Sequence, residues 1–187
     1  MLKRSAPMLS GWGRLKKPGK EVYSEDLKLL SHDATLFRGL GRSYGDSAIP
    51  PPGQLEVAST KLANRILSFE PTTGLLKAEA GLSLQELNRA FLPRCQFPPV
   101  TPGTQFVTLG GMVAADVHGK NHHIDGTFGK HVKNLLIRVS DGRQIKCSPI
   151  QEPDLFWATV GGMGLTGHIL EVEFQMRKIP TPWIYSE

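Results

Sequence analysis

The segment Phe37-Arg38-Gly39-Leu40-Gly41-Arg42-Ser43-Tyr44-Gly45-Asp46 decides how we interpret the rest of the chain. Its glycines permit positive φ and let backbone N–H groups approach a ligand closely, because they lack a Cβ. Successive amides in such a turn form a concave array of donors suited to pyrophosphate. Arg38 and Arg42 can add bidentate, charge-assisted hydrogen bonds to phosphate oxygens, and Ser43 and Tyr44 carry hydroxyl donors. The pattern predicts a loop that holds a phosphorylated ligand, although a solvated surface turn has a similar composition.

The common nucleotide-binding fingerprints do not explain this loop. Its spacing, Gly39-x-Gly41-x-x-x-Gly45, differs from G-x-G-x-x-G, and the prolines at 50–52 cannot continue a helix. A second run, Gly162–Gly167, does fit that pattern. However, it leads into His168–Phe174, whose alternating apolar residues predict a strand. No G-x-x-x-x-G-K-S/T phosphate loop is present. The sequence therefore argues against a Rossmann nicotinamide domain.

Length and composition fit one globular domain with a real core, since 40% of the 187 residues are hydrophobic and 21% are charged. No apolar run approaches the roughly 20 residues of a membrane span, and no secretory signal is visible. The two cysteines, Cys95 and Cys147, form neither a disulfide framework nor a zinc-type pair. We expect a cytoplasmic protein with at most peripheral contact with a membrane.

The net charge of +5 is unevenly distributed. All charged residues that precede the first acidic residue, Glu21, are basic. This marks residues 1–20 as a basic N-terminal arm. Such an arm can rest on an anionic membrane surface or remain solvated. Because 7% of residues are aromatic and no nucleic-acid-binding motif accompanies the charge, we expect no nucleic-acid partner.

Periodicity and turn signals predict an α+β fold. The segment Ser83-x-x-Glu86 has capping-box spacing and predicts a helix through Phe91, and Pro153–Ala158 predicts another. Asp141-Gly142 predicts a hairpin turn. Strands are expected at Leu55–Ala58, Ile66–Phe69, Leu75–Ala80, Leu135–Val139, Gln144–Cys147 and the segment beginning at Ile169 or Leu170.

Two further segments carry candidate site residues. Thr108–Gly111 can start a short helix whose free amides face an anion. The histidine-rich segment Asp116–His123 suggests metal binding, but Gly119 interrupts a helical ligand pair and no general-base glutamate lies within it. We therefore predict no metal site, hydrogen-bonded loop histidines at 122 and 123, and a cofactor-lining role for His118.

Four motifs in this order resemble one family: the loop at 37–46, Pro102–Thr104 with Thr108–Gly111, His118–His123, and Phe156–Gly162. They resemble the PCMH-type FAD-binding domain of the vanillyl-alcohol oxidase/p-cresol methylhydroxylase superfamily. Within it they are most similar to the FAD-linked oxidoreductases of the decaprenylphosphoryl-β-D-ribose 2′-oxidase and D-arabinono-1,4-lactone oxidase type. The resemblance implies two small α/β subdomains with mixed sheets that sandwich the FAD, at about 21–70 and 71–187.

The resemblance also implies site residues. His118 and Lys120 are the expected catalytic residues, facing the flavin ring and the sugar. Arg42 stands where many relatives carry the flavin-tethering histidine of an R-x-G-G-H-S pattern, so the FAD is expected to be non-covalent. The implied FAD contacts are Phe37, Arg38, Gly39, Leu40, Gly41, Arg42, Ser43, Tyr44, Gly45, Asp46, Ser47, Gly103, Thr108, Leu109, Gly110, Gly111, Ala115, Asp116, Val117, His118 and Ile169.

The implied activity is oxidation of a secondary hydroxyl of a sugar or polyprenyl-phosphate sugar to a ketone. Two departures from the family pattern matter. The segment Glu21–Leu36 is shorter than expected, which suggests that a strand–helix unit is trimmed, and the chain stops at Glu187, where a substrate domain is expected to begin. A second chain or domain would then complete the site. The alternative is a catalytically silent flavin-binding or partner-binding module.

Overall fold

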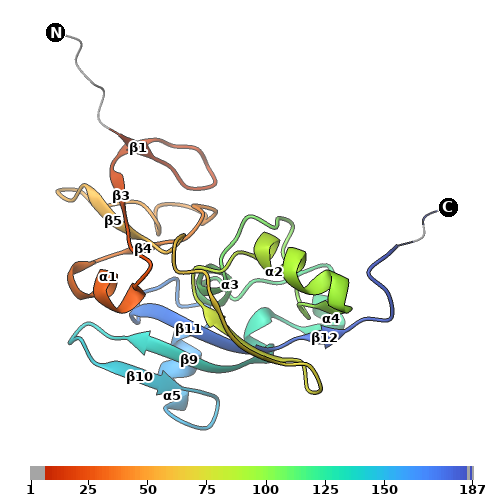
Figure 1. The fold of residues 1–187 in the computed structure, drawn as a ribbon. Coiled ribbons are helices and arrows are strands. Elements are labelled where there is room, and N and C mark those ends of the chain that lie inside the picture. The colour runs from red at the N-terminus through yellow and green to blue at the C-terminus, as the bar shows by residue number, and fades with distance from the viewer. Residues whose placement is uncertain (1–6, 185, 187) are drawn as a thin grey trace.

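The computed structural model describes residues 7–184 and 186 of the chain. Two sheets form its framework, with helix α1 (Leu27–Asp33) between them (Figure 1). The smaller sheet is parallel and comes from the N-terminal third of the chain, whereas the larger sheet is antiparallel. The predicted α+β class is confirmed, and parallel and antiparallel strand pairs occur in different sheets.

The smaller sheet has the order β3 (Lys20–Tyr23), β5 (Glu56–Ser59), β4 (Phe37–Arg38). Helix α1 connects β3 to β4, and its N-terminus is capped by Asp26, whose carboxylate accepts hydrogen bonds from two backbone N–H groups. In the segment Glu21–Leu36, where we expect a trimmed strand–helix unit, both elements are present and each is short. The sheet places the end of β4, and the glycine loop that follows it, at one edge.

The larger sheet has the order β10 (Gln144–Cys147), β9 (Val132–Arg138), β11 (His168–Gln175), β7 (Leu75–Glu79), β6 (Ile66–Glu70). In β11, alternate side chains from Leu170 to Phe174 are buried, which matches the period of a strand. A register shift between Ile169 and Glu171 lets two consecutive residues at the start of the strand face the interior. This strand is the one that follows the G-x-G-x-x-G run.

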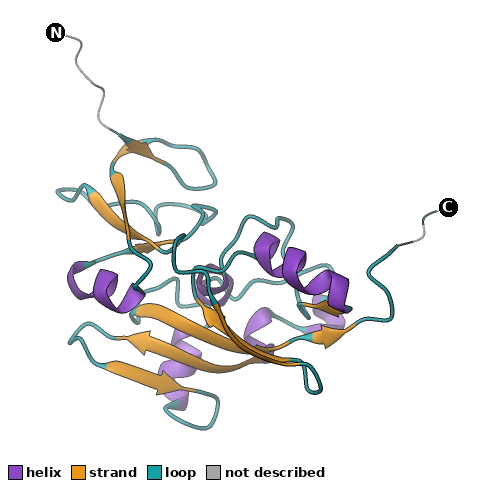
Figure 2. Cartoon of the chain, in the orientation of Figure 1, coloured by secondary structure: helices purple, strands orange, loops and turns teal. Residues whose placement is uncertain are grey.

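Short elements complete the fold (Figure 2). Two-stranded ribbons pair β1 (Met8–Leu9) with β2 (Lys17–Pro18), and β8 (Gln96–Phe97) with β12 (Arg177–Lys178). The remaining helices are α2 (Leu84–Phe91), α3 (Leu109–Ala114), α4 (His122–Asp125) and α5 (Pro153–Thr159), with 3₁₀ turns at Leu92–Arg94 and Phe128–His131.

The core lies between the larger sheet and the helices that pack on it. Phe128 and Phe174 are fully buried, with ring centroids 5.1 Å apart, and Met112 of α3 and Phe156 of α5 are buried with them. Helix α3 packs against β11 and α5 against β10. This packing fixes the start of α3 beside the start of β11, and the pocket described below opens there.

The division of the chain into domains remains a prediction. The boundary expected near residue 70 assigns Ile66–Glu70 to the first subdomain, whereas this strand pairs with β7 in the larger sheet. Residues 1–6 of the predicted basic arm lie outside the described residues. Within the described part of the chain, no helix is long and apolar enough to cross a membrane.

Candidate functional site

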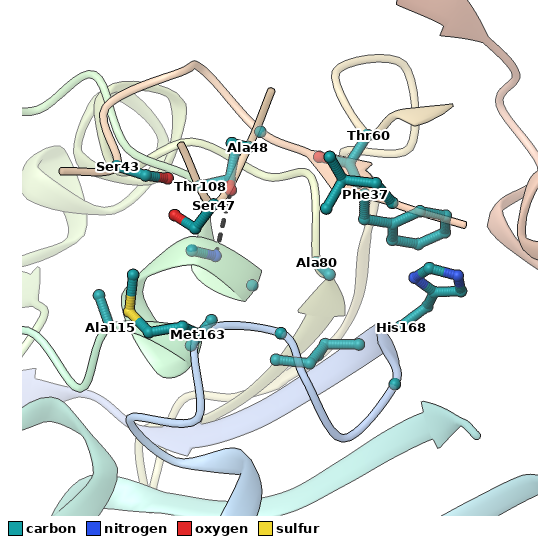
Figure 3. Close-up of a pocket in the computed structure, with 18 of the residues that line it drawn as sticks. Phe37, Ser43, Ser47, Ala48, Thr60, Ala80, Thr108, Ala115, Met163 and His168 are labelled. Atoms are coloured by element: carbon teal, nitrogen blue, oxygen red, sulfur yellow. Dashed lines mark hydrogen bonds between the residues drawn. The ribbon is translucent and has the colours of Figure 1, made fainter. Parts of the chain in front are cut away.

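Three segments that are distant in sequence meet around one cavity of about 110 Å³, which we call the first pocket. Figure 3 shows Ser43 and Ser47 on the glycine loop above α3, Met163 below the helix, and Phe37 and His168 at the other end. The lining residues are Thr35, Leu36, Phe37, Gly39, Ser43, Ser47, Ala48, Thr60, Ala80, Thr108, Gly110, Gly111, Ala114, Ala115, Met163, Gly164, Gly167, His168 and Ile169.

The glycine loop keeps its backbone donors free. Among the described residues, no carbonyl or side chain accepts a hydrogen bond from the N–H groups of residues 39–48. The Ser47 hydroxyl, which is buried on the pocket wall, also has no partner among the described residues. Buried polar groups are normally hydrogen-bonded. The loop therefore presents an array of donors for which the protein itself provides no acceptor, as a phosphate-binding turn requires.

Glycine is required where the loop approaches α3. A Cβ built on Gly39 would lie 2.5 Å from the Thr108 hydroxyl oxygen, which caps α3 by accepting a hydrogen bond from the Gly111 N–H. Gly110 is similarly close to Ala80, at 3.0 Å from Cβ to Cβ. The loop can approach the start of α3 because Gly39 lacks a side chain, and the start of α3 can approach the segment after β7 because Gly110 lacks one.

The N-terminal amides of α3 are not free, so this part of the sequence prediction is wrong. Leu109 and Gly110 donate to the carbonyls of Leu82 and Ala80 at 2.9 and 2.8 Å, and Gly111 donates to the Thr108 hydroxyl. These hydrogen bonds join the start of α3 to the chain segment that follows β7, so the N–H groups there are already paired. The free amides of this site come from the loop and not from the helix.

Arg38 lies inside the loop. Its Nε donates to Glu21 and its two Nη atoms donate to the carbonyls of Ala48 and Ser10, each at 2.8 Å. The side chain is 8% exposed. The guanidinium that we expected to bind phosphate is thus engaged within the protein. Arg42, in contrast, is exposed, donates to the Leu40 carbonyl and lies 6.0 Å from the centroid of the Phe106 ring.

His168 is a pocket residue that the sequence analysis missed. Its ring stacks on Phe37 with centroids 4.1 Å apart, and Nε2 lies 2.8 Å from the Ala34 carbonyl oxygen. Burial lowers the pKa of His168, and nearby Arg138 lowers it further, although the Ala34 hydrogen bond opposes both. A neutral imidazole then donates through Nε2. Only its position directly after the G-x-G-x-x-G run could have marked this residue in the sequence.

The predicted catalytic residues lie elsewhere, in a wider and more open depression of about 790 Å³ that we call the second pocket. His118 and Lys120 are both exposed there, together with the predicted FAD contact Gly103. A bridge between His118 and Thr127 and a hydrogen bond from the Phe128 N–H to the Val117 carbonyl hold this segment in place. The other lining residues are Phe97, Pro98, Pro99, Thr101, Pro102, Gly119, Asn121, His122, Arg177 and Ile179.

Charges in the second pocket are unequally available. Arg177 is paired with Asp125, which also accepts a hydrogen bond from Asn121. Lys120 forms no ion pair with a carboxylate in the described part of the chain. Nor do the described residues contain a group of three His, Cys, Asp or Glu side chains that could hold a metal ion. Lys120 is therefore a cation available to an anionic ligand.

Several predicted FAD contacts lie outside the first pocket. Leu109 is fully buried in the core, and Val117 packs against it. Asp116 has a φ of 39° and accepts a hydrogen bond from the Gly129 N–H at 2.8 Å, so its side chain holds the turn at Phe128–His131. Tyr44 is 79% exposed. Of the predicted contacts, the first pocket brings together Phe37, Gly39, Ser43, Ser47, Thr108, Gly110, Gly111, Ala115 and Ile169.

A loop with unpartnered amides, set against a helix start and an aromatic wall, is the arrangement expected of a dinucleotide cofactor site. Residues 30–148 match the family model described as an FAD binding domain, which is more than half of the chain. The chain belongs to this family, in its PCMH-type form, and its cofactor is FAD.

Two of the individual relatives are oxidases by name. The chain is 39% identical over 191 residues to the decaprenylphosphoryl-beta-D-ribose oxidase of Mycolicibacterium smegmatis, a match that covers 96% of the chain. It is 26% identical over 151 residues, or 79% of the chain, to the D-arabinono-1,4-lactone oxidase of Yarrowia lipolytica. The chain spans 41% of the first relative and 28% of the second.

Proposed function

We propose that this chain binds FAD non-covalently in the first pocket, as part of an oxidoreductase that oxidises a secondary hydroxyl of a sugar or polyprenyl-phosphate sugar. The observation that carries the proposal is the run of unpartnered N–H groups at residues 39–48, together with the orphaned Ser47 hydroxyl. These donors fit a pyrophosphate, which offers only acceptors. The close approach at Gly39 supports the same placement, because a side chain there would occupy the space between loop and helix.

Non-covalent binding is proposed from Arg42. A guanidinium cannot form the bond that a histidine makes to the flavin, and Arg42 lies on the solvent side of the loop, where it donates to the Leu40 carbonyl. No residue of the first pocket except His168 carries an imidazole, and the His168 ring is occupied by its stacking on Phe37 and its hydrogen bond to Ala34.

The second pocket is the proposed substrate site. Ala115 lines the first pocket and His118 lines the second, so only two residues separate the two pockets along the chain. Bound FAD supplies a hydride acceptor for an alcohol carbon. His118 is placed to orient the substrate hydroxyl or take its proton. Lys120 is placed to pair with a substrate phosphate as a compact point charge.

We also propose that a further domain or chain completes this site. His118 and Lys120 are exposed on an open surface, whereas oxidation of an alcohol benefits from a cavity that excludes water. The regions that the relatives have beyond the matched residues are candidates for this role, because the match covers 41% of the longest-matching relative named above.

An absorbance spectrum of the purified chain with and without added FAD tests the binding. We expect flavin bands near ~370 and ~450 nm, and acid precipitation should release the colour to the supernatant. Colour retained in the pellet would contradict non-covalent binding, and a chain that leaves the spectrum of FAD unchanged would contradict the flavin site itself.

Anaerobic addition of candidate sugars and sugar phosphates then tests the reaction. Bleaching of the flavin band, which is lost in His118→Ala and Lys120→Ala variants that still bind FAD, supports the oxidoreductase. A flavin that binds but is reduced by none of them supports the alternative, a flavin-binding or partner-binding module without turnover of its own.

A further inference from the structure

Backbone hydrogen bonds within the glycine loop are confined to its end, where the Ile49 N–H donates to the Asp46 carbonyl at 3.0 Å. The N–H groups of residues 39–48 donate no hydrogen bond among the described residues, and no backbone hydrogen bond joins residues 39–45 to one another. Open loops of this kind have many conformations, and a donor array binds an anion well only when its members already point inward. Contacts from outside the loop backbone must therefore hold residues 39–45 in place.

Arg38 holds the loop from within. Its guanidinium joins the Ala48 carbonyl, at the far end of the loop, to Glu21 of strand β3, which lies beyond β5 in the same sheet. Gly41, with a φ of +68°, folds directly over this guanidinium, and a Cβ at that position would collide with Nη2 of Arg38. The loop is thus wrapped around one buried side chain.

Glu21 anchors that side chain. Its carboxylate is 7% exposed and accepts hydrogen bonds from Arg38 at 2.8 Å, Lys61 at 2.6 Å and Ser59 at 3.3 Å. Burial by itself would raise the pKa of Glu21, but the hydrogen bonds from Lys61, Tyr23 and Arg38 outweigh it and the pKa is lowered. The carboxylate therefore stays charged at neutral pH and keeps the guanidinium in place.

A short N-terminal segment, Ser10–Arg14, holds the loop from outside, and we call it the N-terminal clasp. The Ser10 carbonyl accepts a hydrogen bond from Arg38, and the Trp12 N–H donates to the Ser43 carbonyl at 3.0 Å. Gly11 lies flat against the loop, since a Cβ there would be 2.7 Å from the Gly45 carbonyl oxygen and 2.9 Å from that of Ser43. The contacts of Gly11 and Trp12 are made to loop carbonyls, so they leave the loop N–H groups free.

We propose that the N-terminal clasp and Arg38 are positioning elements of the cofactor site, which preorganise the donor array of residues 39–48 without touching the ligand. None of the clasp residues lines the first pocket. The proposal rests on the proposed placement of the FAD pyrophosphate over this loop. It assigns to the N-terminal segment a role in FAD affinity, in addition to any role in stability.

Two neighbouring glycines provide a matched test in the full chain. Gly11→Ala adds a methyl group against two loop carbonyls, whereas Gly13→Ala adds the same group where no atom lies within 4 Å. If Gly11→Ala reduces the population of the competent loop to about a tenth, the dissociation constant for FAD rises about tenfold. Gly13→Ala should bind FAD like the wild type. Equal, undiminished FAD affinity in the two variants would overturn the proposal.

A second pair of variants covers the case in which Gly11→Ala does not fold. Arg38→Lys keeps the charge beside Glu21 but cannot reach three acceptors, while Arg65→Lys makes the same change in the Arg65–Glu79 pair, neither residue of which lines the first pocket. FAD affinity should fall in Arg38→Lys and not in Arg65→Lys. Equal FAD affinity in these two variants would overturn the role of Arg38.

Limited trypsin digestion separates positioning from general stability. Arg42 in the loop and Arg143 in the β9–β10 hairpin are both exposed, so cleavage after Arg143 serves as an internal reference. In Gly11→Ala and Arg38→Lys, cleavage after Arg42 should accelerate relative to that after Arg143. A parallel rise at both sites would indicate global destabilisation and contradict the proposal. Failure of the wild type and of Gly13→Ala to bind FAD would instead refute the proposed function.

Discussion

Ser47 is a residue whose hydroxyl we expect to strengthen FAD binding without stabilising the FAD-free chain. Its hydroxyl oxygen is buried on the wall of the first pocket and has no partner among the described residues. A neutral hydrogen bond contributes roughly 0.5–1.5 kcal/mol. We therefore expect Ser47→Ala to weaken FAD binding by about twofold to tenfold while leaving the free energy of unfolding of the FAD-free chain unchanged or slightly raised.

Fluorescence titration with FAD and chemical denaturation measure the two effects of Ser47→Ala. Ser68→Ala, on the exposed strand β6, is the control and should change neither quantity. A Ser47→Ala variant that loses stability but binds FAD normally would show that the hydroxyl has a partner within the protein.

Gly39 is the residue where the backbone itself sets the geometry of the pocket. In Gly39→Ala the new Cβ would displace the Thr108 hydroxyl, which is 2.5 Å away and caps α3. Loss of an N-cap costs about 1 kcal/mol, and overpacking adds roughly 1–3 kcal/mol. We expect a lower free energy of unfolding and weaker FAD binding, both measured against Gly13→Ala. A variant as stable as that control would contradict the close approach of loop and helix.

His168 makes the stability of the chain depend on pH. Its pKa is lowered below 6.5, chiefly by burial, so the unfolded chain binds this proton more readily than the folded chain. The stabilisation present above the unfolded pKa is lost as the pH falls below that value. The lowered pKa values of Glu21 and Glu86 add further loss only below their ordinary value of 4.5.

We therefore expect a lower thermal midpoint at about pH 5.5 than at about pH 7.5, with a smaller difference in His168→Gln. Glutamine keeps a donor for the Ala34 carbonyl but does not titrate. An identical pH dependence in the variant would mean that another group carries the effect.

At the scale of elements, sequence signals predicted correctly those helices, turns and strands that are specified by residues close to them in the sequence. The Ser83–Glu86 capping box forms as predicted, with hydrogen bonds in both directions, and begins α2. The Asp141-Gly142 hairpin joins β9 to β10, and strand β11 follows the second glycine run. These signals lie within a few residues of the elements that they specify, which is why the sequence reveals them.

The capping box also gives a prediction at this scale. Ser83→Ala removes the hydroxyl that accepts a hydrogen bond from the Glu86 N–H, and should lower the free energy of unfolding by about 1 kcal/mol. FAD affinity should not change, because Ser83 does not line the first pocket. Ser83→Thr, which can still cap, is the control in denaturation. A loss of stability in the threonine variant as large as that in alanine would show that the hydroxyl is not the cause.

Elements held by distant partners were missed. Strand β3 is four residues long and half polar, and its partner β5 lies more than 30 residues away in sequence, at Glu56–Ser59. The Asp26 cap of α1 was present in the sequence but precedes a helix of only seven residues. The roles of Arg38 and His168 depend on Glu21 and Ala34, which are 17 and 134 residues away. Residue type and spacing cannot specify such pairs.

At the scale of the whole molecule, the fold places the two pockets at successive parts of one segment, which runs from α3 to Lys120. The loop and α3 enclose the first pocket, and the segment after α3 carries His118 and Lys120 to the second. From the sequence alone, the expected catalytic residues His118 and Lys120 were placed against the flavin ring, because motifs carry no information about which cavity each side chain lines. The structure places the unpartnered loop donors at the first pocket and the exposed His118 and Lys120 at the second.

The central claim is that the backbone N–H groups of residues 39–48 bind the FAD pyrophosphate. Hydrogen–deuterium exchange of the full chain with and without saturating FAD tests it most directly. We predict that FAD slows exchange in residues 39–48 by roughly tenfold or more, with little change in the β6–β7 turn at residues 71–74, at the opposite end of β7 from the pocket residue Ala80. Bound FAD that leaves the exchange of residues 39–48 unchanged would contradict this account of the site.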